Sequence, residues 1–347
     1  MNQGAQSDAS SVRSRRPVGI AICTYRRPAG LARILAALPV GVGSETPPRI
    51  FVVDNDGTDP SIEGIIAEAR AGTGLDIHLV VESHPGISAA RNRAIVEAEA
   101  VGVELLAMLD DDEWPIEDWL PRMLGRQRET GANVVSGTVS PVFPVENQDL
   151  VPYGQFWSVL PQRRDGRDFI YATSNVLIDL AAIRDVSRPL FDDAYGLSGG
   201  GDLVFFSRLF SLGKTMAWAE EAVVLEEVPP KRASWKWQSQ RRHRSGNHMV
   251  MEEEQSAGGR LKPMLKTVGL CARLVIYPLL GREPGAQLRG WWLESMKIRG
   301  RLAAHRGLLV HEYARDGVAL RRAVPPPAKP RSERPGRNPN PDRDFRG

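Results

Sequence analysis

The chain has 347 residues, of which 42% are hydrophobic and 25% are charged. This is the composition of an ordinary globular protein, long enough for one large domain or two smaller ones. Its two cysteines, Cys23 and Cys271, lie far apart in apolar stretches, which argues against a disulfide framework and indicates a reducing cytosol. Residues 1–16 are polar and Ser-rich, without the apolar segment of a signal peptide, and are expected to form a disordered leader.

Charge is divided unevenly along the chain. The formal net charge is only +3, but acidic residues outnumber basic ones in residues 1–230, whereas basic residues outnumber acidic ones in residues 231–330. A basic C-terminal segment after an acidic body indicates an anionic partner, which could be phosphate groups, nucleic acid or a membrane surface.

The first part of the chain alternates apolar strands with helices. Helices are predicted at 26–40, 61–72 and 86–100, and buried strands at "VGIAICTY" (18–25), "RIFVVDNDG" (49–57), "LDIHLVVES" (75–83) and "VELLAMLDDD" (103–112). This alternation predicts an α/β fold with a mostly parallel sheet and helices on both faces. Ligands bind beyond the carboxyl ends of such strands. The polar clusters that end three of them, "TYRR", "DNDG" and "DDDE", are therefore expected to converge on one crevice.

After Trp119 the pattern changes. Strands are predicted at 133–143, 168–179 and 216–229, and a helix at 202–213. We expect these elements to extend the same sheet, so that residues 17–230 form one domain. Residues 231–322 are predicted to be helical and basic, and the Pro-, Arg- and Asn-rich residues 323–347 to form a disordered tail.

Two common nucleotide-binding motifs are missing from the sequence. There is no G-x-G-x-x-G after the first strand and no G-x-x-x-x-G-K-[ST] anywhere, which disfavours a Rossmann dinucleotide site and a P-loop. The groups that handle an anion would instead be a metal ion on aspartates, together with Arg26, Arg91 and helix N-termini.

Three consecutive aspartates, Asp110, Asp111 and Asp112, end the fourth predicted strand. Carboxylate oxygens suit hard cations, and Mg²⁺ typically takes one or two of them while substrate phosphates and water fill its other positions. A D-x-D at a strand end fits this arrangement, with one carboxylate on the metal and another on a ribose or sugar hydroxyl. The alternative is a solvated acidic turn.

Three further motifs each have a functional and a structural interpretation. Asp54, in "VVDNDG", could accept a hydrogen bond from a nucleobase, or belong to the turn that Asn and Asp form before Gly. Arg91, in "GISAARN", could face the cleft from the start of its helix or lie in solvent. Asp202, in "SGGGD", could cap its helix or serve as a general base over the cleft.

Taken in order, these motifs resemble those of family 2 glycosyltransferases with the GT-A fold of nucleotide-diphospho-sugar transferases. The resemblance covers about residues 18–250, in the stretches "VGIAICTYRRP", "IFVVDNDGTD", "GISAARNRAI", "LLAMLDDDEWP", "SNVLI" and "SGGGDLVFFSRLFSLG". It implies transfer of a sugar from a nucleotide-sugar with inversion. The segment "EEVPPKRASWKWQSQRRHRSGN" also resembles bacterial enzymes that build exopolysaccharides of the succinoglycan type.

The resemblance implies roles for four residues on the nucleotide side of the site. Thr24 and Arg26 would border the nucleotide at the end of the first strand. Asp54 would contact the base, and Arg91 would lie beside the base or the phosphate. The donor expected on this resemblance is a UDP-sugar.

On the sugar side, the resemblance assigns the four remaining aspartates. Asp110 and Asp111 would hold the ribose and the sugar, Asp112 would bind Mn²⁺ or Mg²⁺, and Asp202 would be the catalytic base. The family often has a glutamate immediately before that last aspartate, where this chain has Gly201.

A second departure lies in the strand predicted at 216–229. Glu226 or Glu227 falls where many relatives carry a histidine near the metal site, and the sequence assigns this glutamate no role.

Aromatic and basic residues alternate in "KRASWKWQSQRRHRSGNH" (231–248). This pattern occurs in nucleic-acid-binding segments and at membrane interfaces, and it would also suit a flap over a diphosphate or a solvated basic helix. The apolar stretch 267–281 is interrupted by Arg273 and is shorter than the ~20 residues that a membrane span needs. We favour peripheral attachment to the cytoplasmic face of the membrane, where a polyprenyl-diphosphate-linked glycan acceptor would lie, and expect no nucleic-acid partner.

Two other functions fit parts of the sequence. A nucleotidyltransferase on a related fold would need a Gly-rich loop bearing Lys or Arg after the first strand, and "TYRRPAG" is a poor match. A basic module that binds nucleic acid or membrane without catalysis would leave the aspartate cluster and Asp202 unexplained.

Overall fold

The computed structural model describes most of the chain, namely residues 16–43, 47–193, 200–257, 259–276, 284–310 and 320–322. The predicted leader, apart from Arg16, and the predicted tail lie outside the described residues.

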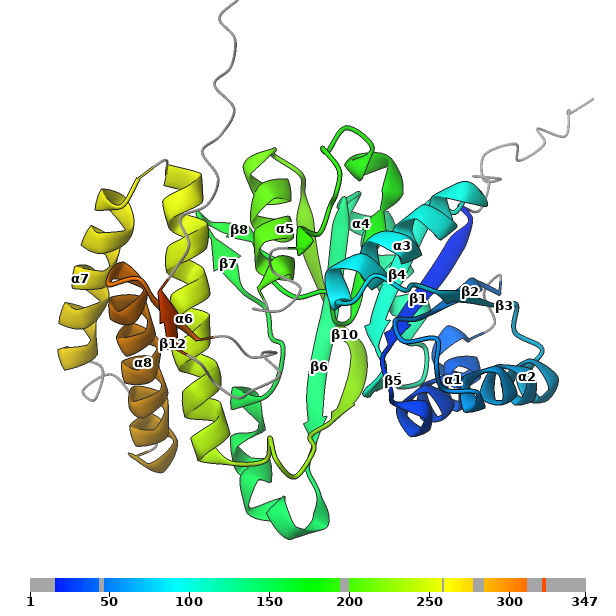
Figure 1. Ribbon diagram of the computed structural model, residues 1–347, viewed down its shortest axis with the longest axis horizontal. Coiled ribbons are helices and arrows are strands. Elements are labelled where there is room, and N and C mark those ends of the chain that lie inside the picture. The colour runs from blue at the N-terminus through cyan, green and yellow to red at the C-terminus, as the bar shows by residue number, and fades with distance from the viewer. Residues whose placement is uncertain are drawn as a thin grey trace, which may run out of the picture.

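An eight-stranded sheet forms the centre of the molecule (Figure 1). Its strands, in spatial order, are β3 (Ile77–Val81), β2 (Arg49–Asp54), β1 (Val18–Thr24), β4 (Leu105–Asp110), β9 (Val176–Asp179), β6 (Val134–Val142), β10 (Met216–Glu227) and β5 (Glu113–Pro115). The first four run parallel, and β9 is antiparallel to both of its neighbours. β10 runs parallel to β6, while β5 pairs with it in the antiparallel direction. The mostly parallel α/β sheet predicted from the sequence is confirmed.

Helices cover both faces of this sheet (Figure 1). They are α1 (Pro28–Val42), α2 (Ser61–Thr73), α3 (Ile87–Ala100), α4 (Trp119–Thr130) and α5 (Gly201–Ser211), with shorter 3-10 segments at Val145–Phe156 and Leu180–Ile183. Right-handed crossovers place α1 and α2 on one face, because the chain steps from β1 to β2 to β3 in one direction. The step from β3 back to β4 reverses that direction and places α3 on the other face. Ligands bind such sheets beyond the carboxyl ends of the strands at this reversal, which here are β1 and β4.

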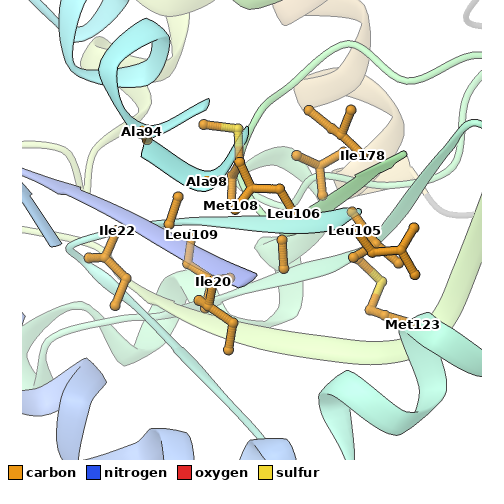
Figure 2. Packing of buried hydrophobic residues seen from close by; sticks show 14 of the residues in the cluster. Ile20, Ile22, Ala94, Ala98, Leu105, Leu106, Met108, Leu109, Met123 and Ile178 are labelled. Carbon is orange, nitrogen blue, oxygen red and sulfur yellow. The ribbon is translucent and has the colours of Figure 1, made fainter. Parts of the chain in front are cut away.

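Apolar side chains on β1 and β4 fill the space between the layers (Figure 2). Ile20 and Ile22 of β1 and Leu106 of β4 are fully buried. Ala94 and Ala98 of α3, which are also fully buried, have short side chains that let the helix lie close to the sheet. Close packing on both faces holds the ends of β1 and β4 in fixed positions.

The strand predicted at 168–179 is shorter in the structure. Only β9 and the two-residue β8 (Arg167–Asp168), which pairs with β7 (Arg163–Arg164), are strands there. Asn175 interrupts the strand because its φ is 51°, in the left-handed region that Asn tolerates better than most residues. Its buried amide accepts a hydrogen bond from Trp119 Nε1 (2.6 Å) and donates to the carbonyls of Thr138 and Ala222 (2.9 and 2.8 Å).

The C-terminal region contains three helices, α6 (Trp235–Ala257), α7 (Leu261–Ile276) and α8 (Pro284–His305), which lie together at one end of the sheet (Figure 1). At the crossing of α6 and α8 the backbones touch, since a Cβ on Gly246 or Gly300 would lie 2.0 or 1.9 Å from a carbonyl oxygen of the other helix. Within the described residues, no helix is long and apolar enough to cross a membrane.

After its three helices, the C-terminal region ends in two short strands in the described residues. Gly307 adopts a φ of 75° just after α8, which is a typical way for a helix to stop. The segment that follows forms a strand, β11 (Leu308–Val310), which pairs with β12 (Leu320–Arg322) in the antiparallel direction.

Replacing Asn175 by alanine should destabilise the fold. The change leaves the indole N–H of Trp119 and two buried carbonyls without their partner, and each buried unsatisfied group costs about 1–3 kcal/mol. We expect the free energy of unfolding in urea to fall by about 3 kcal/mol. Gln148→Ala, which removes an exposed amide, is the matched control and should change it little. Equal stability of Asn175→Ala and wild type would contradict this account of the strand.

Candidate functional site

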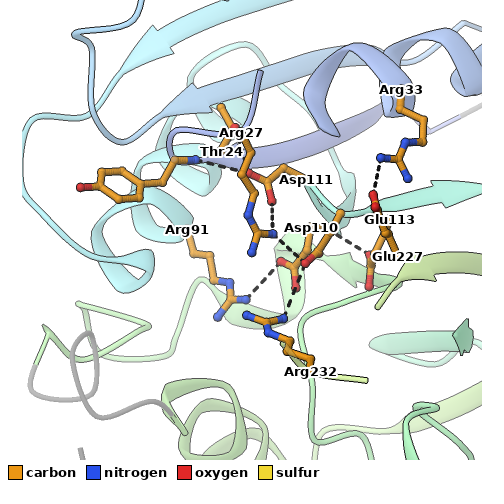
Figure 3. A network of polar contacts seen from close by, with 11 residues as sticks. Thr24, Arg27, Arg33, Arg91, Asp110, Asp111, Glu113, Glu227 and Arg232 are labelled. Carbon is orange, nitrogen blue, oxygen red and sulfur yellow. Dashed lines mark hydrogen bonds and ion pairs between the residues drawn. The ribbon is translucent and has the colours of Figure 1, made fainter. Parts of the chain in front are cut away.

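A cluster of charged side chains lies beyond the carboxyl ends of β1 and β4 (Figure 3). Because Cys23 of β1 pairs in register with Asp110 of β4, the residues that follow each strand are neighbours. The sheet order therefore brings the predicted residues Thr24, Asp110 and Asp111, together with Asp112, to one place.

Arg27 is the cation that lies among the aspartates. It directly precedes α1, and its Nη1 atom donates to Asp111 Oδ1 at 2.9 Å and to Asp112 Oδ2 at 2.6 Å. The backbones are equally close, because a Cβ on Gly30 would lie 2.3 Å from the carbonyl oxygen of Asp111. No role was predicted for Arg27 from the sequence, and in the structure it holds two adjacent carboxylates in place.

Asp111 is bound to the end of β1 by several hydrogen bonds. Its Oδ2 accepts from Thr24 Oγ1 at 2.9 Å and from the Tyr25 backbone N–H at 3.4 Å, and the residue is buried. Burial raises the pKa of the Asp111 carboxyl, while the charge of Arg27 lowers it. Asp111 thus fixes the distance between β1 and the turn that carries Asp112.

Asp110 faces Arg91, which comes from α3 on the other side of the sheet. Arg91 Nη2 lies 3.3 Å from Asp110 Oδ1. Burial raises the pKa of Asp110, Arg91 lowers it, and the negative charges of Asp112 and Asp202 raise it further. Asp202 therefore acts on the same cluster from the start of α5.

Two glutamates lie at this site, and both carboxyl groups hold their protons more tightly than usual. Glu113 is buried and accepts a hydrogen bond from the Asp110 backbone N–H at 3.0 Å, and burial together with Asp110 raises its pKa well above the usual range. Glu226, near the end of β10, has its pKa raised to about 7 by burial and by the charge of Asp112. No role was predicted for Glu113 from its place in the "DDDEWP" stretch.

The C-terminal region contributes cations to the same site. Arg232 Nη1 lies 3.7 Å from Asp112 Oδ2, and the charge of Arg241 lowers the pKa of Glu226. Both guanidinium groups lie over the ring of Trp237, at 5.7 and 5.4 Å from its centroid. The acidic body and the basic segment thus meet at the aspartate cluster.

The other residues predicted on the nucleotide side, Arg26 and Asp54, lie at the ends of β1 and β2. Arg26 is exposed and pairs with Asp56, with Nε 2.9 Å from Oδ2. Asp54 is buried, and its Oδ1 accepts a hydrogen bond from the Asp56 backbone N–H at 3.0 Å. Asn55 accepts a hydrogen bond from the backbone N–H of Gly86 (2.8 Å), which ties the end of β2 to the start of α3.

Asp202 lies in the first turn of α5, where its Oδ1 accepts a hydrogen bond from the Leu203 backbone N–H at 2.9 Å. Gly200 precedes it with a φ of 86°, and a Cβ there would lie 2.9 Å from the ring of His248. The first residues of the "SGGGD" motif, Ser198 and Gly199, lie outside the described residues.

Comparison with known proteins identifies the family. The sequence model described as "Glycosyl transferase family 2" matches residues 19–186, which include every predicted site residue except Asp202. The chain is also 37% identical over 231 residues to the succinoglycan biosynthesis protein ExoM of Rhizobium meliloti strain 1021, a match that covers 66% of this chain and 72% of that protein. The chain belongs to glycosyltransferase family 2. It is therefore a glycosyltransferase, as its motifs predicted.

Two further proteins are similar to this glycosyltransferase. Glycosyltransferase AglE of Haloferax volcanii is 24% identical over 213 residues, which cover 61% of this chain and 67% of that protein. The mannosyltransferase PcManGT of Pyrobaculum calidifontis was solved in complex with GDP-Man and Mn²⁺. Its structure matches this one with a TM-score of 0.52 at 16% sequence identity, and the match covers 84% of this chain and 88% of the PcManGT chain. The latter similarity confirms the predicted GT-A fold.

Glu226 should make the metal-free glycosyltransferase less stable as pH rises. Its pKa in the folded protein is about 7, above the ordinary value of 4.5, so the folded state binds this proton more tightly than the unfolded state. The stability from Glu226 is complete below about pH 4.5 and is lost as pH rises through about 7. In EDTA, Glu226→Gln should raise the free energy of unfolding at pH 8 by about 1–3 kcal/mol and change it little at pH 4.5.

Glu227→Gln is the matched control for this measurement, since the neighbouring glutamate pairs with Arg33 on the exposed side of the strand. Glu227→Gln should not raise the free energy of unfolding at pH 8, because it removes an ion pair. The same slope in Glu226→Gln as in wild type would show that Glu226 is ionised at neutral pH in the folded protein.

Proposed function

We propose that this glycosyltransferase moves a sugar, with inversion, from a nucleoside-diphosphate-sugar to a hydroxyl group of a glycan or lipid-linked glycan. The observation that carries this proposal is the acidic cluster at the reversal between β1 and β4, with Asp202 acting on it from α5 and arginines from three directions. The similarity to ExoM, which is named for succinoglycan biosynthesis, supports a role in cell-surface or exopolysaccharide synthesis. A UDP-sugar is the donor that we propose, by the resemblance of the motifs.

The donor atoms of the cluster fit Mn²⁺ or Mg²⁺. The cluster offers carboxylate oxygens, which hard cations prefer. Within the described residues, no three His, Cys, Asp or Glu side chains are placed to bind a metal ion by themselves. Asp112 would hold the ion through Oδ1, since its ionic contacts to Arg27 and Arg232 both use Oδ2. When bound, the metal would supply positive charge for the diphosphate leaving group.

The chain's own residues support the other steps. In the proposed reaction Asp202 accepts the proton of the acceptor hydroxyl, whose oxygen bonds to the anomeric carbon as the bond from that carbon to the diphosphate oxygen breaks. Arg91 would lie beside the base or the phosphate, and Arg232 would stabilise the charge that develops on the diphosphate. Asp110 and Asp111 would hold the ribose and the sugar, while Thr24, Arg26 and Asp54 would border the nucleotide.

The acceptor that we propose is a glycan carried on a polyprenyl diphosphate. Such a substrate would bring the enzyme to the cytoplasmic face of the membrane, as a peripheral protein. Of the two alternatives, the non-catalytic binding module is excluded by membership of an enzyme family, and the nucleotidyltransferase has no support from the matching family.

The proposed role of Asp202 predicts a specific loss. Asp202→Asn should lower turnover of the best nucleotide-sugar by at least ~10²-fold, because an amide cannot accept the hydroxyl proton. Affinity for the corresponding nucleoside diphosphate should stay within about twofold of wild type. The donor is found first by incubating the protein with a panel of nucleotide-sugars and Mn²⁺, with and without EDTA, and measuring release of nucleoside diphosphate.

The matched control is Asp185→Asn, which makes the same change at an exposed carboxylate paired with Lys214. It should keep full activity. An equal loss of binding and turnover in Asp202→Asn would show that Asp202 only supports the structure, and no release from any donor would overturn the proposed function itself.

A further inference from the structure

Helix α7 exposes its apolar side to solvent. Its exposed apolar residues have relative accessibilities of 56–78% and are Leu261, Met264, Leu265, Val268 and Val275. The spacing of these positions, i, i+3, i+4, i+7 and i+14, places them on one face of a helix. A soluble helix normally turns such a face to the core, so this stripe needs a partner that the rest of the chain does not provide in the described residues.

The opposite side of α7 faces the other helices, and buried hydrogen bonds of Thr267 hold it there. Thr267 is buried, and its Oγ1 accepts a hydrogen bond from Arg301 Nε of α8 at 2.9 Å. Arg301 is itself 1% exposed and binds both carboxylate oxygens of Glu253 on α6, at 2.6 and 3.3 Å. Glu253 also binds Lys266 of α7 at 2.6 Å.

This network fixes the orientation of the helix. Rotating α7 to bury its apolar stripe would take Thr267 and Lys266 away from Arg301 and Glu253, and a buried charge that loses its partners is strongly unfavourable. Trp291 of α8 adds a second anchor, since its Nε1 donates to the carbonyl of Leu274 at 3.1 Å. The outward stripe is therefore built into the contacts between α6, α7 and α8.

The charge on α7 indicates the chemistry of its partner. The helix has no acidic side chain, and Lys262 and Arg273 lie on one flank of the apolar stripe, while Lys266 pairs with Glu253. Apolar residues bordered by cations match the interface of an anionic bilayer, where acyl chains lie beneath negative headgroups. With 16 residues, α7 is shorter than the ~20 that a span needs, so it would lie in the plane of the interface.

We propose that the outer face of α7 docks the enzyme on the surface of an anionic lipid bilayer. This inference rests on the proposed function only in that a lipid-linked acceptor would be found at such a surface. The docking face differs from the Trp- and Arg-rich stretch at the start of α6 that the sequence offered for this contact. There the ring of Trp235 lies against Tyr153, Phe156 and Trp157, at centroid distances of 5.3–5.7 Å.

The same helix α6 links the two places. At one end Arg241 acts on Glu226 of the aspartate cluster, and further along Glu253 holds Arg301 and α7. Figure 1 shows α7 at the outer edge of the helical group, with α6 between it and the sheet. A bilayer bound at α7 would thus lie on the side of the C-terminal helices that faces away from the sheet.

Vesicle sedimentation tests the proposal with the full chain. Wild type should sediment with vesicles of equal parts phosphatidylglycerol and phosphatidylcholine. Its partition into vesicles of phosphatidylcholine alone should be at least tenfold lower. Leu265→Gln/Val268→Gln should lower partition into the anionic vesicles at least tenfold, and Lys262→Glu/Arg273→Glu should do so as well. Val145→Gln/Val151→Gln is the matched control, because these valines are 89% and 54% exposed on another segment, and it should stay within twofold of wild type.

Several results would overturn the docking face. One is wild type that stays in the supernatant with anionic vesicles, and another is undiminished sedimentation of the Leu265→Gln/Val268→Gln variant. If a second copy of the chain covers α7, sedimentation equilibrium without lipid will show a wild-type dimer and a monomeric Leu265→Gln/Val268→Gln variant, and this also overturns the proposal.

Donor hydrolysis in solution separates this proposal from the proposed function. The α7 variants should release nucleoside diphosphate at the wild-type rate, and equal thermal unfolding temperatures will show that they are folded. Asp202→Asn should lose turnover and still sediment with anionic vesicles. If wild type binds anionic vesicles but hydrolyses no donor, the proposed function is wrong and the docking face is still supported.

Discussion

The contact of Arg27 with Asp111 and Asp112 is the interaction on which the site depends. Three adjacent carboxylates at the end of a buried strand repel one another, and burial raises the pKa of Asp110 and of Asp111. The guanidinium group of Arg27 lies between two of them and donates to both. Arg91 and Arg232 approach the outer carboxylates from α3 and from the C-terminal region. The charges are thus nearly balanced by the protein itself.

The sheet topology explains why these residues meet. The reversal of direction between β1 and β4 places the flanking helices on opposite faces, and ligands bind such sheets at this point. Asp111 links the ends of the two strands through Thr24, which holds the turn that carries Asp112. The core beneath is tightly packed, and the strand ends that carry these groups have little freedom to move. The residues that we propose to bind the donor therefore also hold the strand ends together.

Much of this arrangement could be predicted from the sequence. The first four strands and the three helices between them follow from apolar periodicity, and the convergence of Thr24, Arg91 and the aspartates follows from the parallel sheet. The choice between Arg26 and Arg27 could not be predicted. Both lie in one turn, and the left-handed φ of 54° at Arg26 sends the two side chains in different directions. Such a conformation has no signal in the sequence when the residue is arginine.

Tertiary contacts decided the remaining differences. The sequence predicts a strand from residue 168, but β9 begins only after Asn175. The amide of Asn175 satisfies three buried groups from other elements, and these contacts fix its backbone outside the strand conformation. The pattern of α7 shows an amphipathic helix, but which side faces the protein is decided by Arg301 and Glu253, which lie on two other helices. A periodic pattern identifies the two faces of a helix, but it does not predict which face packs against the protein when ion pairs from other helices decide this.

The most direct test of the charge balance is the affinity of the metal-free protein for Mn²⁺, measured by the electron paramagnetic resonance signal of the free ion with and without UDP. Since Arg27 already binds Asp111 and Asp112, the aspartates alone should bind Mn²⁺ weakly, and UDP should tighten binding at least tenfold by adding diphosphate oxygens. Asp112→Ala should lose that gain. Tight binding of Mn²⁺ without UDP, or an undiminished gain in Asp112→Ala, would contradict the account.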